Sequence, residues 1–178
     1  MKQSKAALLL LAASLSACST LQTSTDYDPK ASFAPYRTFA FKDVHEIKNT
    51  LLDTRLKDAV TATLASKGWT RAEKNPDILV VLHVRLSTQT QINTYNSGWG
   101  YGWGWGWGGT GMTTSTVEQI PVGTLIIDLV DARASQLVWR GTASDTIDQD
   151  ASPEERDKNI RNALNKLFEN FPPGQKAK

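Results

Sequence analysis

The stretch that decides the fold is ILVVLHVRLS, residues 78–87. Its odd and even positions fall on opposite faces of an extended chain. One face is apolar throughout, whereas the other becomes polar toward Ser87. The alternation continues to Ile92 and predicts a long strand, Ile78–Ile92, with one face on the core. The apolar face carries Ile78, Val80, Leu82, Val84 and Leu86.

Three further segments have strand character. Tyr36–Phe41 is short and aromatic, and Thr124–Val130 alternates with Leu125, Ile127 and Leu129 on one face. Asp131–Ser135 has the composition of a turn, and the strand predicted at Gln136–Thr146 carries Leu137 and Trp139 inward. In the segment Trp139-Arg140-Gly141, we expect the Arg140 side chain to point outward. We expect Gly141 to permit a bend in the strand or the close approach of a helix.

Two helices are predicted. Thr50–Lys67 repeats apolar residues at the spacing of one helical face, with Thr50 and Asp53 resembling a capping box and Gly68 ending the helix. The second helix opens at Ser152-Pro153-Glu154-Glu155, where Ser152 fits the N-cap. Pro172-Pro173 ends its apolar stripe, which comprises Ile160, Ala163, Leu164, Leu167, Phe168 and Phe171.

The order of elements is strand, helix, a run of antiparallel strands, and helix. It predicts the α+β class: an antiparallel meander sheet with two helices packed on one face. We expect a single domain over residues 26–172 and a flexible tail over 173–178. A long hairpin insertion, residues 93–114, interrupts the run of strands and has a tip rich in Gly and Trp.

The hairpin tip alternates glycine with aromatic residues from Gly98 to Gly109. Four interpretations stay open: a mobile loop tip, a membrane contact, a surface that stacks on glycans or a protein partner, and self-association of exposed edges. The aromatic side chains proposed for ligand or membrane contact are Trp99, Tyr101, Trp103, Trp105 and Trp107.

The N-terminus has the pattern of an export signal. Lys2 and Lys5 precede the apolar run Ala6–Ala13, which is too short to span a bilayer. Leu15–Cys18 resembles the lipobox of bacterial lipoproteins, which implies cleavage before Cys18 and acylation of its thiol. Residues 1–17 are then a signal peptide, and residues 18–25 are the lipidated cysteine and a short tether. The alternative is an ordinary secretory signal with an incidental cysteine.

Charge and cysteine content limit the class of protein. Residues 1–17 hold two lysines and no acid, so the remainder has 18 acidic residues and equally many basic ones. A neutral chain lacks the basic excess of nucleic-acid binders, so we expect no nucleic-acid partner. The single cysteine excludes an internal disulfide framework.

Catalytic patterns are absent from the sequence. His45 and His83 are far apart, and we expect no metal and no cofactor. Asp128 and Asp131 flank a strand end, and a pair of acids could serve in acid–base catalysis. The better explanation of this pair is two solvated acids beside a turn. Asp145, Asp148 and Asp150 precede the last helix, where acids complement the helix dipole. The sequence therefore predicts a protein that is not an enzyme.

Five ordered motifs carry a family resemblance. They are Thr25–Asp28, Tyr36–Ala40, Pro76–Val80, Gly123–Asp131 and Val138–Ala143. Together they resemble the bacterial lipoprotein family called domain of unknown function 4136, over about residues 25–172. The resemblance implies an envelope lipoprotein and a shared fold, and it supplies no catalytic residues.

The expected function is a lipid-anchored protein on the periplasmic face of a Gram-negative outer membrane, with a non-catalytic interaction or structural role. Ser19 carries the outer-membrane expectation, since Asp at that position resembles the signal for retention in the inner membrane. The expected partners are the membrane, through Cys18, and an envelope protein or glycan. The alternative is an envelope glycan-binding or glycan-processing accessory protein, which would need a cleft near Asp128, Asp131 or His83.

Overall fold

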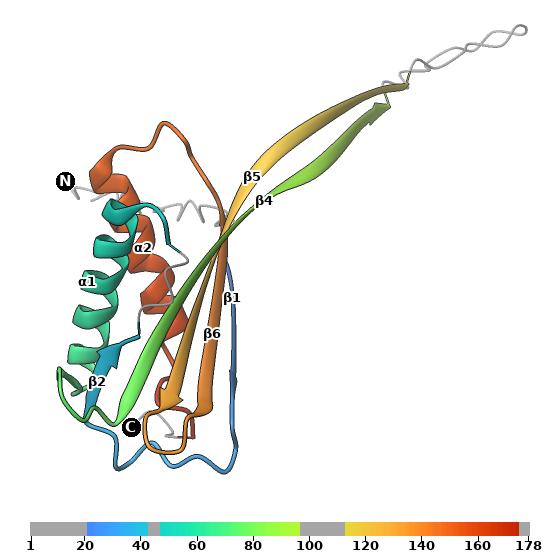
Figure 1. Cartoon of the computed structure of the whole chain (residues 1–178). Helices are drawn as coiled ribbons and strands as arrows, with labels where there is room; N and C mark the ends of the chain where they lie inside the picture. Colours follow the sequence, from blue (N-terminus) through green and yellow to red (C-terminus); the bar gives the residue numbers. More distant parts are fainter. Residues whose placement is uncertain (1–20, 43–46, 97–112, 175–178) are drawn as a thin grey trace, which may run out of the picture.

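A computed structural model describes residues 21–42, 47–96 and 113–174. Both helices pack on one face of a twisted sheet (Figure 1), which confirms the α+β class. The elements of the described chain are β1 (Gln22–Tyr27), β2 (Thr38–Phe41), α1 (Thr50–Ser66), β3 (Thr70–Arg71), β4 (Ile78–Asn96), β5 (Thr113–Asp131), β6 (Gln136–Thr146) and α2 (Pro153–Leu167).

The sheet is mixed. Its strand order is β1-β6-β5-β4-β2-β3. In the series β1, β6, β5 and β4 each strand is antiparallel to its neighbour, but β2 is parallel to both β4 and β3. The predicted purely antiparallel meander is therefore wrong at this edge. The reason is that α1 lies between β2 and β4 in the chain, and a helical crossover lets the next strand run in the same direction.

The first strand lies mostly within the segment that the sequence predicts to be a tether. Gln22–Tyr27 pair along the outer edge of β6, from Gln22 opposite Ser144 to Tyr27 opposite Trp139. Nearly all its side chains are exposed, so no hydrophobic alternation marks it. The first strand of the described residues therefore starts four positions after Cys18.

The N-cap of helix α1 lies one residue before Thr50, the residue that the sequence predicts as the cap. The N-cap is Asn49, whose side-chain oxygen accepts hydrogen bonds from the backbone N–H groups of Leu51 and Leu52. The expected capping box from Thr50 is wrong, because Asn49 already satisfies the free amides of the first turn. Gly68 follows the helix with φ +84°, the left-handed conformation expected of a residue at this position.

Helix α2 follows its sequence signals closely. Ser152 is the N-cap, Pro153 opens the helix, and the reciprocal hydrogen bonds of a capping box join Ser152 and Glu155. The predicted apolar stripe supplies much of the core: Leu164, Leu167, Phe168 and Phe171 are all buried.

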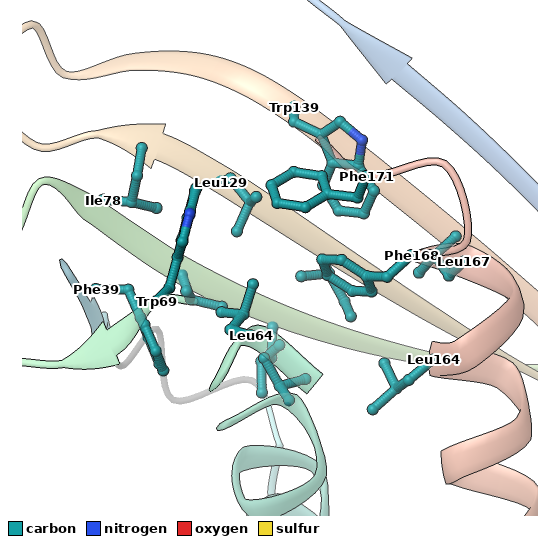
Figure 2. Packing of buried hydrophobic residues seen from close by; sticks show 14 of the residues in the cluster. Phe39, Leu64, Trp69, Ile78, Leu129, Trp139, Leu164, Leu167, Phe168 and Phe171 are labelled. Atoms are coloured by element: carbon teal, nitrogen blue, oxygen red, sulfur yellow. The ribbon is translucent and has the colours of Figure 1, made fainter. Parts of the chain in front are cut away.

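Aromatic rings fill the core beneath the end of α2 (Figure 2). The ring centroids of Trp139 and Phe168 are 4.8 Å apart. Phe171 makes edge contacts with Trp139, Phe168, Trp69 and Phe33, at centroid distances between 5.2 and 5.7 Å. These rings join the sheet, α2 and the loop before β2 into one cluster.

A β-bulge changes the predicted orientation of one residue. Leu129 lies opposite Trp139 and Val130 lies opposite Leu137, so Val138 is an extra residue in β6. Val138 and Trp139 are both buried, whereas Leu137 is 41% exposed. The prediction that Leu137 points inward is therefore wrong, because the bulge resets the alternation between Leu137 and Trp139.

Strands β4 and β5 form a hairpin that projects beyond the helices (Figure 1). They pair from Ile78 opposite Asp131 to Asn96 opposite Thr113. β4 continues past the predicted end at Ile92, and β5 begins well before the predicted start at Thr124. The segments that the prediction missed have no core to face and so lack the apolar alternation. The hairpin tip, residues 97–112, lies outside the described residues.

Gly141 makes the close helix approach that the sequence indicates. A Cβ atom placed on Gly141 would overlap Trp139 Cη2 and would lie 2.8 Å from Leu167 Cδ2. Both neighbours are buried, so neither side chain has free space to move into.

We therefore predict that Gly141→Ala lowers the free energy of unfolding by about 1–3 kcal/mol, the usual cost of overpacking a core. Chemical denaturation followed by tryptophan fluorescence measures the change. Gly123→Ala is the matched control: its nearest neighbour is the side-chain end of Ile147, at 3.0 Å. Equal stability losses in the two variants would contradict the assignment of Gly141 as a packing position.

Candidate functional site

Residues around the turn between β5 and β6 line a pocket of about 450 Å³. This turn lies at the end of the sheet opposite the projecting hairpin (Figure 1). The loop between β1 and β2, the start of β4 and the β5–β6 turn line the pocket. Its polar side chains include Asp28, Tyr36, Asp77, Asp131, Arg133 and Gln136.

Tyr36 and Asp131 form the centre of this pocket. The Tyr36 hydroxyl donates to Asp131 Oδ2 at 2.8 Å, and Asp131 Oδ1 accepts from the backbone N–H groups of Arg133 and Ala134. The Ala134 amide and then the Tyr36 hydroxyl hold the pKa of Asp131 below its ordinary value. Burial, followed by the bond to Asp131, raises the pKa of Tyr36 to about 12. At neutral pH the pair is thus carboxylate and phenol.

Asp77 fastens the start of β2 to the start of β4. Its Oδ2 accepts hydrogen bonds from the Arg37 and Thr38 backbone amides, both at 3.0 Å, and from the Thr38 hydroxyl at 2.8 Å. The guanidinium of Arg133 lies 3.4 Å from Oδ1. The Arg37 amide, then the Thr38 hydroxyl, keep the pKa of Asp77 below its ordinary value. The Asp77 carboxylate therefore has a structural role: its hydrogen bonds hold the starts of β2 and β4 together.

A second polar cluster lies on the face of the sheet opposite the helices. Arg140 donates two hydrogen bonds to Asp128, each at 2.6 Å. His83 Nε2 lies 3.7 Å from Asp128 Oδ2. Asp128 is only 7% exposed, and its hydrogen bonds raise the pKa of Arg140. The fork-shaped pairing compensates the burial of the carboxylate.

The alternative hypothesis needs a cleft near Asp128, Asp131 or His83. Asp131 lines the pocket at the end of the sheet, whereas His83 and Asp128 are neighbours in the second cluster. Arg140 points outward, as expected from the sequence.

The acids before α2 serve the local backbone. Asp145 Oδ1 accepts from the Thr146 amide, and Asp148 Oδ1 accepts from the Asp150 amide. These short-range bonds shape the loop that leads into the helix.

Other predicted site residues lie outside the described residues. They are Cys18 in the N-terminal segment, His45 in the segment 43–46, and the hairpin-tip residues Trp99, Tyr101, Trp103, Trp105 and Trp107.

Sequence reasoning misses Tyr36, Asp77 and Arg133 as pocket residues. Tyr36 is separated from Asp131 by 95 positions, and Asp77 from Arg133 by 56. The only local signal is the position of Asp77 between a proline and a strand, which is typical of structural aspartates in turns.

The chemistry available to these groups is limited. Within residues 21–42, 47–96 and 113–174, no group of three or more His, Cys, Asp or Glu side chains is placed to hold a metal ion. Neither described helix has the length and apolarity needed to cross a membrane. A general acid needs a carboxyl group that is protonated near neutral pH, and the hydrogen bonds to Asp77 and Asp131 favour their ionised forms.

Solved structures resemble this fold at low sequence identity. A PDZ domain protein from Parabacteroides distasonis aligns with a TM-score of 0.56 and 14% identity, over 90% of this chain and 38% of that chain. This chain thus spans well under half of that protein. PelC from Paraburkholderia phytofirmans, crystallised as a dodecamer, aligns with a TM-score of 0.44 and 14% identity, over 83% of this chain and 96% of its own. The first likeness concerns the fold alone.

No curated protein matches the sequence. One family model does, and it extends over residues 23–173, from within β1 to the residues that follow α2. The match covers most of the chain and confirms the resemblance carried by the five motifs. The chain therefore belongs to the family described as a domain of unknown function, DUF4136.

Proposed function

We propose that the chain is a lipid-anchored envelope protein, attached through Cys18 to the periplasmic face of a Gram-negative outer membrane, with a non-catalytic interaction role. The observation that carries the proposal is the position of the first strand. β1 begins at Gln22, four residues after the cysteine of the lipobox-like segment. The four Cα–Cα steps from Cys18 to Gln22 span at most about 14 Å, so an acylated Cys18 holds the body against the membrane surface.

The entry point of the chain also locates the anchor on the body. Gln22 pairs with Ser144, Ser144 with Thr124, and Thr124 with Arg85. The chain therefore enters the sheet at the base of the projecting hairpin and runs toward the pocket. An anchor at Cys18 therefore attaches the body at the base of the hairpin, at the opposite end of β1 from the pocket.

The hydrogen bonding of the acidic side chains supports a non-catalytic role. Asp77 and Asp131 accept backbone amides that fix strand ends and a turn, and Asp128 is bound by Arg140. A glycan-processing enzyme uses two facing carboxyl groups, one of them a general acid with a raised pKa. The aspartates of the pocket have the opposite shift.

The anchor is tested by Cys18→Ser. The variant should move from the membrane fraction to the soluble periplasmic fraction, because no thiol is left to acylate. Fractionation of intact cells measures the distribution, and mass spectrometry of the mature N-terminus reads the acyl chains. Thr20→Ser, two positions along, is the control and should stay in the membrane. Retention of the Cys18→Ser chain at the wild-type level would show that the anchor lies elsewhere.

The membrane is tested separately by Ser19→Asp. We expect this variant to remain lipidated but to shift from the outer to the inner membrane, because Asp next to the acylated cysteine resembles the retention signal. Density-gradient separation of the two membranes measures the shift. Ser19→Thr is the conservative control. An unchanged gradient profile for Ser19→Asp would contradict the sorting assignment and leave the anchor itself standing.

The structural role of the carboxylates gives a pH prediction. The pKa of Asp77 is lower in the folded chain than the ordinary value near 4, so the folded state binds fewer protons than the unfolded state around pH 4. The stabilisation is complete above that pH and is lost as the pH falls through the lower, folded-state pKa. Asp77→Ala should cost about 1–3 kcal/mol at pH 7 through unsatisfied amides.

Thermal unfolding from pH 7 down to pH 2 tests both parts. Wild type should lose stability steeply below pH 4, and Asp77→Ala should lose less over the same range because the group is gone. Asp58→Ala, on the exposed side of α1, is the control and should follow the wild-type curve. A variant with wild-type stability at pH 7 would show that the Asp77 hydrogen bonds contribute nothing.

A further inference from the structure

The projecting part of the β4–β5 hairpin has two strand edges that no described strand covers. β2 pairs with β4 only from Ile78 to Val80, and β6 pairs with β5 only as far as Val122. Beyond these points the two strands continue as a ribbon away from the body (Figure 1). A two-stranded ribbon alone is marginally stable in water, and its open edges can pair with another strand.

The hydrogen bond at the base of the ribbon shows which residues face the open edge of β4. The Val80 carbonyl accepts from the Lys42 amide, so the backbone of Val80 points away from β5. Along an antiparallel strand, the backbone N–H and C=O groups of successive residues point alternately toward one neighbouring strand and toward the other. The even-numbered residues from Val84 to Thr94 therefore direct their N–H and C=O groups outward, and the odd-numbered ones bond to β5.

These outward residues lack the features that protect an edge. Natural edge strands are blocked by lysine, proline or bulges. The even positions of β4 from residue 84 onward hold Val84, Leu86, Thr88, Thr90, Ile92 and Thr94, with no charge and no proline. The open edge of β5, by contrast, has Pro121 at its base, and the carbonyl of Pro121 is already bonded to the Ile147 amide. The β4 edge is the more available of the two.

Apolar side chains on the same face are exposed in the single chain. Leu86 is 75% exposed, Ile92 64% and Val117 62%. Ile92 and Val117 lie directly opposite each other, and Leu86 lies opposite Gly123. All three sit on the ribbon face that continues the core face of the sheet. Leu86 therefore has no large apolar neighbour across its own ladder, and a second strand is needed to supply one.

We propose that the β4 edge pairs antiparallel with the β4 edge of a second copy of this chain, about a two-fold axis at Gln89. In this register Thr88 lies opposite Thr90 of the second copy, and Leu86 lies opposite Ile92 of the second copy. The same surface serves both copies, as a closed two-fold dimer requires. The product is a four-stranded ribbon with a folded body at each end.

The exposed apolar residues select this register. Centring the axis one residue later would place Leu86 opposite Thr94, and centring it one residue earlier would place Leu86 opposite Thr90. Of these three axes, only the one at Gln89 places Leu86 of the second copy next to the cross-strand pair of Val117 and Ile92. The two-fold symmetry forms this apolar row twice in the dimer. Apolar pairs and threonine pairs facing each other across strands are both stabilising.

Disulfide trapping tests the register. Two full-length chains, one with Thr88→Cys and one with Thr90→Cys, carry different tags and are co-expressed in the Cys18→Ser background, so each has a single thiol. Facing residues in a hydrogen-bonded pair have Cα atoms about 5.5 Å apart, which suits a disulfide. We expect the mixed, doubly tagged dimer to exceed either like-with-like dimer several-fold. Equal yields of all three, or no dimer, would overturn the register.

Light scattering tests the edge itself. The Cys18→Ser chain should have twice the mass of one chain, which also separates this proposal from the anchor, since no lipid is present. Thr88→Lys with Thr90→Lys brings four like charges together at the axis and should halve that mass. Ser115→Lys with Gln119→Lys on the β5 edge is the matched control and should stay dimeric. A monomeric parent chain, or dissociation by the β5 variant alone, would overturn the proposal.

Discussion

The contact between Trp139, Gly141 and Leu167 determines where α2 lies on the sheet. Because Gly141 has no side chain, the Trp139 ring and the end of α2 both occupy the space above it. That approach brings Phe168 and Phe171 onto the indole ring. The second layer of the fold is thus fixed at one position of β6, and the other core residues of α2 extend from that point.

The sequence predicts an element well when the side chains of that element are themselves buried or form its cap. The alternation from Ile78 marks β4, and Ser152 with Glu155 marks the start of α2, because burial or capping acts on those residues directly. The edge strand β1 is held by backbone bonds to β6, which leave no trace in side-chain type. The bulge at Val138 has the same cause: alternation places Leu137 inward, and only the register with β5 shows otherwise.

The residues of the candidate site likewise differ in how far the sequence predicts them. Asp128 and Asp131 stand out in the sequence because they flank a strand end. The sequence does not show which side chains pair with them, because Tyr36, Arg140 and His83 reach them through strand register and loop closure. Aspartates that look alike in sequence therefore serve two separate structural clusters. What distinguishes them is the donor each one faces, and this depends on topology.

Anchoring and self-pairing reinforce each other in the proposed dimer. A two-fold axis perpendicular to the ribbon keeps the same face of both copies on the same side, so both chains enter their sheets facing one membrane. Along the strand direction, the two entry points, level with Arg85 of each copy, are about eight residues apart, or roughly 26 Å. Confinement of both copies to one surface raises their effective concentration, as linking two binding modules does. Lipidation therefore strengthens a contact that the uncharged β4 edge already makes in solution.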